Sequence, residues 1–303
     1  MDPNLLYWKS EGQSFLSRLH IWANLLDPTY LLSSDAEILK AHASLGSGET
    51  NEEDVPAKTL SLSSVHAGSG AVLPLAFRPP AFLLISAPLV LGSFLPHSSV
   101  KPALFWQFLL QSYSAGFNYA NRSSSPEQDK KRHFKELLLI TGTVSCTTCA
   151  GALPHIFIKQ LSIQSPPLRT FFRSILPIPL SAALAFFNVY TVRSVESETG
   201  IQVFDTNGNP VGISKAAGEK AVTETALSRA ALFGMTAVIP NLLVLLIRGT
   251  RPFHHMSVVV VLGLMIPVSF SLFPQLEMIK KENLEEELQA AAGNGHLFYH
   301  RGL

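Results

Sequence analysis

The 303-residue chain is short of charge and of cysteine. Only 15% of its residues are Asp, Glu, Lys or Arg, whereas 47% are hydrophobic, and the net charge is +1 with His neutral. This composition is too apolar for an ordinary soluble domain. Without clustered basic residues it also excludes a nucleic-acid-binding surface. Two cysteines cannot staple an extracellular scaffold, so the sequence indicates an intracellular or organellar protein.

Targeting and catalytic motifs are absent as well. The first residues, MDPNLLYWKSEGQSF, have neither the basic and apolar pattern of a secretory signal nor the Arg-rich, acid-poor pattern of a transit peptide. Internal segments are therefore expected to direct membrane insertion, and the mature protein is expected to begin at its first residues. No GxSxG, Walker, HExxH or dinucleotide-binding motif occurs. We predict no enzymatic activity and no cofactor.

The N-terminal quarter, residues 1–79, is mostly polar and carries nine acidic and five basic residues. It is predicted to be a soluble helical segment. A turn at Asp27-Pro28 should precede an amphipathic helix with Ser33 or Ser34 as its N-cap. Residues 46–64 contain few hydrophobic side chains and are predicted to form a loop.

Residues 80–276 are predicted to form a transmembrane helical bundle. Residues 81–95 are apolar but too short for the roughly 20 residues that a spanning helix needs, so they either lie at the interface or lead into the first span. Five longer stretches follow, and the expected fold class is an all-α membrane protein with about five transmembrane helices. The predicted spans are 102–120, 137–158, 174–192, 230–247 and 256–276.

The remaining segments are predicted to lie outside the bilayer. Asn207-Gly208 between two short apolar runs is typical of a hairpin turn, and residues 214–230 should form a helix along the membrane surface. Residues 277–303 should form a short, exposed, charged helix, stopped by Gly293, followed by a tail. Five spans would place the termini on opposite sides, while the Lys and Arg distribution gives no orientation.

Prolines occur within or near the ends of four predicted spans: Pro154, Pro177 with Pro179, Pro240 and Pro267. Each proline inside a helix frees a backbone carbonyl group, and transporters use broken helices to expose such groups at mid-membrane. Kinked packing is the commoner explanation for any single proline. Both interpretations stay open.

A row of polar side chains follows the first predicted span. In WQFLLQSYSAGFNYANR the polar residues recur at steps of 4, 3, 4 and 3, which places them on one face of a helix. This stripe comprises Gln107, Gln111, Ser114, Asn118 and Asn121. Its side chains could line a polar path for a zwitterionic solute, or they could hold neighbouring helices together by hydrogen bonds. No Asp, Glu, Lys or Arg lies in the middle of a predicted span, so no charged counter-group is visible.

Metal ligands are sparse. Cys146 and Cys149 lie one helical turn apart and are weak candidates, because zinc and iron–sulfur sites need about four ligands and these are the only cysteines. Buried packing is the expected role of the pair. His254 and His255 are expected in a loop, as part of an interfacial basic cluster near anionic lipid rather than a metal site.

Four stretches of the sequence, in order along nearly the whole chain, resemble the sideroflexin family. They are LLDPTYLLSS, FWQFLLQSYSAGFNYANRS, FDTNGNPVGISKAAGEKAV and LFYHRGL. The resemblance implies a multi-pass protein of the mitochondrial inner membrane. It also implies transport of serine or related small amino acids and effects on iron and one-carbon metabolism.

The family motif HPDTGE is degenerate here. The aligned stretch reads HAGSGA, so His66 and Gly70 remain, Ser69 replaces Thr, and Arg78 lies at the expected offset, but Gly68 and Ala71 replace both acids. Loss of a carboxylate removes a group that could neutralise an ammonium group or pair with a basic side chain. His66 could still cap or orient the helix that follows.

In the stripe helix, Leu110 and Ser114 replace family asparagines. Such losses resemble a divergent branch of the family, for which the resemblance implies a role in respiratory complex I assembly and iron–sulfur supply.

Two functional hypotheses follow. In the first and favoured one, the helical scaffold is retained and complex I assembly factors bind to it through residues 1–79 or 277–303. In the second, the polar stripe carries a small neutral amino acid through the membrane. Membrane lipids are expected contacts under either hypothesis.

Overall fold

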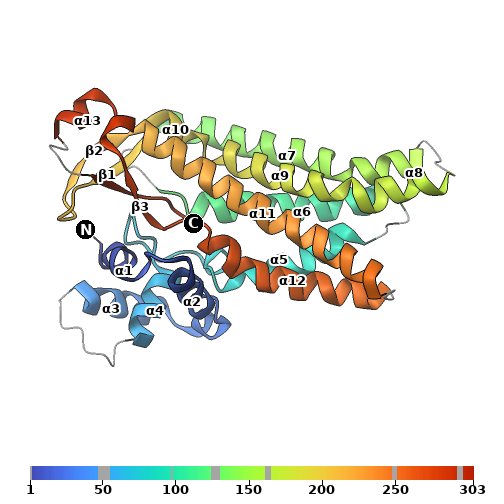
Figure 1. Cartoon of the computed structure of the whole chain (residues 1–303), viewed down its shortest axis with the longest axis horizontal. Helices are drawn as coiled ribbons and strands as arrows, with labels where there is room; N and C mark the ends of the chain where they lie inside the picture. Colours follow the sequence, from blue (N-terminus) through green and yellow to red (C-terminus); the bar gives the residue numbers. More distant parts are fainter. Residues whose placement is uncertain are drawn as a thin grey trace.

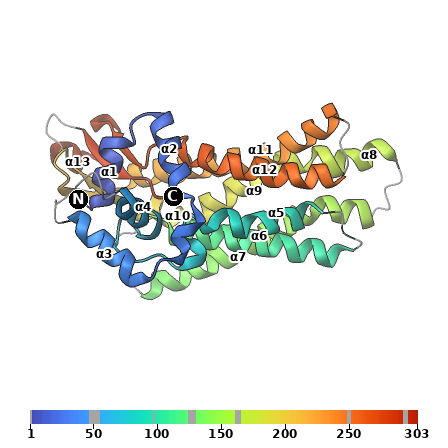
Figure 2. The same cartoon turned by 90° about the horizontal axis from the view of Figure 1, so that it is seen from below.

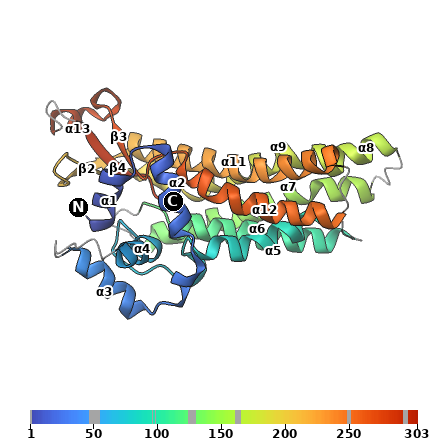
Figure 3. The ribbon, with the colours of Figure 1, turned by 60° about the horizontal axis from the view of Figure 1, so that its bottom comes forward.

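The computed structural model of the chain describes residues 2–46, 55–95, 97, 99–123, 130–160, 165–247, 251–291 and 296–303. It is mainly helical. A long bundle carries a smaller layer of N-terminal helices and a β-sheet at one end (Figures 1 and 3). The expectation of a helical membrane protein with an N-terminal helical segment is confirmed.

The N-terminal layer contains short helices. They are α1 (Pro3–Glu11), α2 (Phe15–Leu25), the 3₁₀ turn η1 (Pro28–Leu32), α3 (Asp35–Gly46), α4 (Val55–Ser64) and the 3₁₀ turn η3 (Leu75–Phe77). The predicted turn at Asp27-Pro28 is confirmed, because Asp27 caps η1. Ser34 is the residue that caps α3: its backbone N–H donates to the Glu37 carboxylate, and the Glu37 N–H donates to its hydroxyl, as in a capping box.

The loop predicted for residues 46–64 is wrong at its C-terminal end. Residues 55–64 form α4, and residues 47–54 lie outside the described residues. Tertiary packing provides what the sequence pattern did not show. The Ser61 hydroxyl, which is fully buried, donates to the Asn4 side chain and is bonded to His42. Polar contacts with α1 and α3 therefore stabilise a helix that has few hydrophobic side chains.

Six helical segments form the bundle. They are α5 (Ala81–Phe94), α6 (Val100–Ala120), α7 (Lys130–Gln160), α8 to α9 (Pro166–Thr170, the π-helical turn η4 at Phe171–Ile175, and Pro177–Val192), α11 (Lys215–Ile247) and α12 (Arg251–Ser271). Contacts close them into a ring in the order α5, α6, α7, α9, α11, α12. Figure 2 shows α5, α6 and α7 on one side and α9, α11 and α12 on the other.

Four of these helices are long and apolar enough to cross a membrane: Phe134–Lys159, Pro166–Val192, Lys215–Val244 and Pro252–Ser271. The 21-residue α6 lies among them and carries the polar stripe, so about five spans is roughly right. The shorter apolar helix α5 leads into α6. This agrees with one of the two expectations for residues 81–95.

Two span predictions need correction. Residues 215–229 do not form a separate surface helix, because they continue into 230–247 as one helix, α11. Small side chains on this part, including Ala217, Ala221 and Ala226, are fully buried against the rest of the molecule. The last predicted span is too long at its C-terminal end, since α12 ends at Ser271 and a strand begins at Leu276.

Both termini lie at the same end of the bundle, beside the sheet (Figure 1). The prediction that they lie on opposite sides is therefore wrong. It counted five passes along the bundle, whereas α5 runs alongside the others and makes six in the described part of the chain.

A four-stranded antiparallel sheet covers the end of the bundle in the order β2-β1-β4-β3. Its strands are β1 (Ile201–Phe204), β2 (Pro210–Ser214), β3 (Leu276–Ile279) and β4 (Leu297–His300). The hairpin predicted at Asn207-Gly208 is confirmed, with Gly208 at φ +86°. This positive angle is one that glycine adopts without strain. The short helix α10 (Ser194–Thr199) leads from the bundle into β1.

The C-terminal segment contains a β-strand in addition to the predicted helix. Its helical parts are η5 (Lys281–Asn283) and the short α13 (Glu286–Ala291), while Gly293 lies outside the described residues. The tail forms the inner strand β4, in which Tyr299 is fully buried. Burial of alternate side chains of β4 explains why this segment pairs instead of projecting into water.

Candidate functional site

A cavity of about 560 Å³ lies inside the bundle, and all six passes contribute to its lining. Its volume falls in the range of roughly 300–1,000 Å³ that is typical of sites for small ligands. Prolines at two positions face it, Pro154 on α7 and Pro177 at the start of α9. Helices α7, α11 and α12 run through Pro154, Pro240 and Pro267 without interruption, so the broken-helix interpretation does not hold for them.

The polar stripe of α6 divides at the floor of this cavity. Gln107, Gln111 and Ser114 line it, whereas Asn118 and Asn121 lie below it. Gln107 packs against Gly151, and its Oε1 atom is buried without a hydrogen-bond partner among the described residues. Gln111 accepts a hydrogen bond of 3.0 Å from the amide of Asn188 on α9. The stripe therefore lies partly on the cavity, and Gln111 also bonds a neighbouring helix.

The lower half of the stripe holds the helix and its neighbours together. The Asn121 amide donates to the carbonyl groups of Phe77 and Phe117, both at 2.9 Å. Asn118 donates to the Ser114 carbonyl, one turn back on its own helix. Both side chains are buried, so this half is structural.

Charge is distributed unevenly around the cavity. Lys159, Arg169 and Arg173 line it, and none of its lining residues is Asp or Glu. The reason is visible in the sequence, since residues 55–126, 137–195 and 225–276 contain no acidic residue at all. A positively charged, acid-free cavity matches a carboxylate or phosphate better than an ammonium group.

Three histidines also line the cavity: His97, His155 and His254. The rings of His97 and His155 lie 5.5 Å apart. Contrary to the prediction, His254 and His255 do not lie in a loop, because α12 already begins at Arg251. No group of three or more His, Cys, Asp or Glu side chains among the described residues is arranged to hold a metal ion.

Cys146 and Cys149 lie on the outer face of α7 and are exposed. The expectation that they are buried packing residues is wrong. Their neighbours Val144, Thr147 and Thr148 take the inward positions on the helix. No third ligand accompanies them in the described part of the chain.

The degenerate motif lies at the opposite end from the cavity mouth, between the N-terminal layer and α6. His66 is buried, and its Nε2–H group donates to the Arg122 carbonyl just after α6. The His66 Nδ1 atom accepts from the backbone N–H groups of Gly68 and Ser69, which fixes the tautomer. Burial lowers the pKa of His66. This histidine therefore fixes the turn after α4 and links it to the end of α6.

The rest of the motif also has a structural role. Gly70 adopts φ +67° and closes the turn, and the Ser69 hydroxyl is bonded to His66 Nδ1. Arg78 is buried, with its guanidinium group 2.7 Å from Asp35 and its Nε–H group donating to the Leu73 carbonyl. Gly68 and Ala71, which replace the family acids, are exposed and do not line the cavity. The loss of the two acids therefore removes no charge from the cavity.

A network of buried charged residues, here called the base, joins the bundle to the sheet. It comprises the ion pairs Arg122–Glu136 and Arg193–Glu196, with Arg301 from the C-terminal segment. Arg193 has no exposed surface and donates to Glu196, to the Thr225 hydroxyl and to the Arg301 carbonyl. The Leu303 N–H group donates to the Asn121 carbonyl, so the C-terminal segment packs against the end of the stripe.

Arg229 was missed by sequence reasoning, because the fourth span was predicted to begin one residue after it. In the longer helix α11 it lies inside a candidate span and is 2% exposed. Its guanidinium carbon lies 4.2 Å from the centre of the Phe270 ring. Asn188 was missed too. It could have been found from the sequence, because it is the one amide side chain in the third predicted span, 174–192.

The family is settled by comparison with known proteins. The family model described as "Sideroflexins" matches residues 4–303. The chain belongs to the sideroflexin family. It is 53% identical to Sideroflexin-4 of Danio rerio over the whole of both chains, and 37% identical to Sideroflexin-4 of Bos taurus, again over both whole chains.

Similarity extends to another member, Sideroflexin-5 of Rattus norvegicus, at 28% identity over 96% of this chain and 89% of that one. No solved structure matches. Family membership, together with four helices able to cross a membrane, establishes this sideroflexin as a multi-pass membrane protein and supports a transporter-like role.

Proposed function

We propose that this sideroflexin lies in the mitochondrial inner membrane and supports the assembly of respiratory complex I, and with it iron–sulfur supply and iron homeostasis. The observation that carries the proposal is a set of exposed apolar side chains on the folded N-terminal layer. Leu16, Leu32 and Val55 are 74%, 87% and 59% exposed. Large apolar side chains exposed on a water-facing layer are typical of protein interaction sites.

Charge favours a protein partner over the membrane surface for this layer. Residues 1–79 carry nine acidic and five basic residues, and the cytoplasmic and matrix-type surfaces of membranes are negatively charged. An acidic layer is repelled by such a surface. A partner with apolar and basic side chains would match it, and complex I assembly factors are the proposed partners.

The test compares deletion with rescue. Blue-native gels of mitochondria that lack the protein should show less complex I, and the wild-type chain should restore it. The variant Leu16→Ser/Leu32→Ser should insert normally but restore less. Ile213→Ser is a matched control, because Ile213 is exposed on the sheet and not on the N-terminal layer. Normal complex I in deleted cells would refute the proposal.

A second function, transport of serine or another small neutral amino acid, is favoured by one observation. The cavity lies in the membrane bundle and is lined by Gln107, Gln111 and Ser114, three members of the stripe. The amide groups could bond a substrate carboxylate, yet no acidic lining residue is present to pair with its ammonium group.

Uptake of labelled serine by reconstituted protein tests this second function. Gln107→Leu is the informative variant, because Gln107 lines the cavity, while Asn118→Leu serves as a control below its floor. Uptake that is lost only in Gln107→Leu would support transport. Absent uptake by a folded wild-type protein would refute it.

A further inference from the structure

Three cationic side chains and one histidine form two stacked pairs at the cavity mouth. His155 and Lys159 are four residues apart on α7, and Arg169 and Arg173 are four residues apart across α8 and η4. Residues at this spacing lie one above the other on the same face of a helical segment. The lining contains no Asp or Glu side chain. The mouth is therefore a concentrated positive region.

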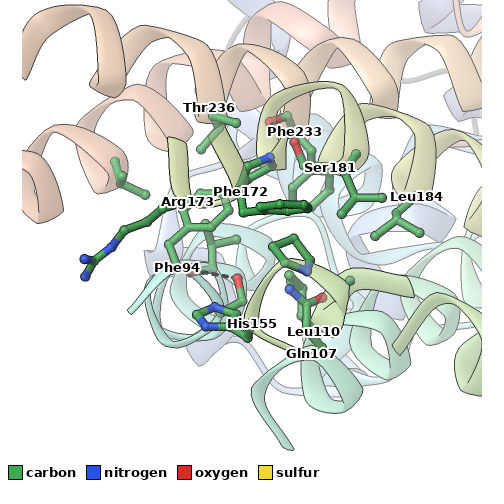
Figure 4. Close-up of a pocket in the computed structure, with 18 of the residues that line it drawn as sticks. Phe94, Gln107, Leu110, His155, Phe172, Arg173, Ser181, Leu184, Phe233 and Thr236 are labelled. Carbon is green, nitrogen blue, oxygen red and sulfur yellow. Dashed lines mark hydrogen bonds between the residues drawn. The ribbon is translucent and has the colours of Figure 1, made fainter. Parts of the chain in front are cut away.

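The deeper walls have a different character. Phe94, Leu110, Leu184 and Phe233 line them, interrupted by a few amide and hydroxyl groups. In Figure 4 the guanidinium group of Arg173 extends away from Gln107 and Leu110, toward the outside of the cavity. The cavity is thus amphipathic, with its charge at the mouth and apolar surface inside.

The mouth also lies at the level expected for lipid headgroups. One candidate span ends at Lys159, and the next begins at Pro166, three residues before Arg169. Basic pockets between transmembrane helices at this depth bind anionic headgroups. A water-soluble anion would gain nothing from the apolar walls, whereas an acyl chain would remain shielded from water by them.

We infer that the cavity binds an anionic phospholipid, with the phosphate against Lys159 and Arg173 and part of one acyl chain among the apolar walls. The volume of about 560 Å³ accommodates a chain segment but not a whole lipid. The rest of the lipid remains in the bilayer. This binding goes beyond the proposed assembly function and does not require transport.

Lipid retention tests the inference. The full-length protein is reconstituted in nanodiscs of phosphatidylcholine with a minor fraction of phosphatidylglycerol, then released, and its retained lipid is counted by native mass spectrometry. Wild type should keep one phosphatidylglycerol in preference to phosphatidylcholine. Lys159→Gln/Arg173→Gln should reduce this preference roughly tenfold or more, since each interfacial cation contributes to binding an anionic headgroup. Equal retention of both lipids by wild type would overturn the inference.

A matched control separates the mouth from general surface charge. Lys101 is an exposed cation near the same end of α6 that does not line the cavity, and Lys101→Gln should keep the preference. An equal loss in Lys101→Gln would show that surface charge alone selects the lipid, which would overturn a cavity site.

Two further measurements test the acyl chain. Leu184→Trp places a larger side chain in the apolar part of the cavity and leaves Lys159 and Arg173 unchanged. It should lower the retention of phosphatidylglycerol. Glycerol 1-phosphate, which has the phosphate but no chains, should fail to displace the lipid at equal concentration. Displacement by glycerol 1-phosphate would identify the site as one for soluble phosphates and contradict the lipid assignment.

Discussion

The two ends of the bundle differ in how their charged side chains are paired. At the base, Arg193 and Glu196 face each other at 2.6 Å, and Arg193 has further partners on α11 and the C-terminal segment. Around the cavity, cations have no acidic neighbours in the lining, and the Oε1 atom of Gln107 has no hydrogen-bond partner among the described residues. Buried ion pairs fasten elements together, whereas Lys159 and Arg173 have no acidic lining residue beside them in the cavity.

This contrast also shows why the altered motif says little about the cavity. The motif belongs to the paired end, where His66 links the N-terminal layer to the residue after α6 and Arg78 pairs with Asp35 inside the layer. The replaced acids would have stood at exposed positions of that layer. Their loss changes an exposed surface of that layer, on which the proposed assembly partner is expected to bind.

The largest expected loss of stability comes from a variant that disrupts the base. Arg193→Leu leaves the Glu196 carboxylate buried without its cation, and loss of one partner of a buried pair costs about 3–5 kcal/mol of unfolding free energy. Denaturation in detergent should show this loss. Arg193→Leu/Glu196→Leu should recover part of it, because no unpaired charge remains.

The exposed Arg173 provides the matched control at the other end. Arg173→Leu should change the unfolding free energy by no more than about 0.5 kcal/mol, as is usual for surface positions. Comparable losses at both ends would contradict the distinction between a paired base and an open cavity.

The second effect is a sensitivity to acid at two buried histidines beside the base, His66 and His300. Burial lowers the pKa of His66, and burial together with nearby cations lowers the pKa of His300 to about 3. As pH falls below about 6.5, the unfolded chain binds protons that the folded chain does not. Stability is therefore full above that pH and is lost as pH falls toward the folded pKa.

The acid effect has a size and a test. Between pH 7 and pH 5.5 protonation of His300 should cost about 1 kcal/mol of unfolding free energy, and His66 should add a loss of the same sign. The thermal midpoint of the wild type should fall over this pH range, and the midpoint of His300→Gln should fall by less. The control His20→Gln changes an exposed histidine of α2 and should leave the pH dependence intact. If His300→Gln had the same pH dependence as the wild type, His300 would not be a cause of the acid sensitivity.

A smaller effect separates the halves of the stripe. Asn121→Leu removes two hydrogen bonds, to the Phe77 and Phe117 carbonyl groups, and should cost about 1–2 kcal/mol. It should leave lipid retention at the cavity unchanged, because Asn121 does not line it. Reduced retention with normal stability would show that the lower half of the stripe also serves the ligand.

Much of the bundle could be predicted from the sequence because its signals are local. Apolar runs marked four spans, Asp27-Pro28 and Ser34 marked a turn and a cap, and Asn207-Gly208 marked the hairpin. The polar stripe was found from its spacing alone. The three residues of the stripe that line the cavity were therefore identified before the fold was known.

Other features depend on contacts distant in sequence. The strand at 297–300 exists because it pairs with residues 201–204 and 276–279, which lie elsewhere in the chain. Similarly, Arg169 and Arg173 were not predicted at the site, because only the ring of helices brings them together with Lys159 and Gln107. Helix α11 begins at Lys215, before its apolar run. The hydropathy pattern therefore placed the start of this helix too late, at residue 230.

The smallest effect sharpens the comparison within the upper stripe itself. Gln111→Leu removes the hydrogen bond to Asn188 and should cost about 0.6 kcal/mol, the average for such bonds between membrane helices. Gln107→Leu removes a buried oxygen that has no partner in the described structure, so it should be neutral or slightly stabilising. Thermal unfolding of both variants in one lipid environment measures the difference. If Gln107→Leu proved the more destabilising, Gln107 would be a packing residue, and the ligand site would have to be sought among the remaining side chains of the cavity.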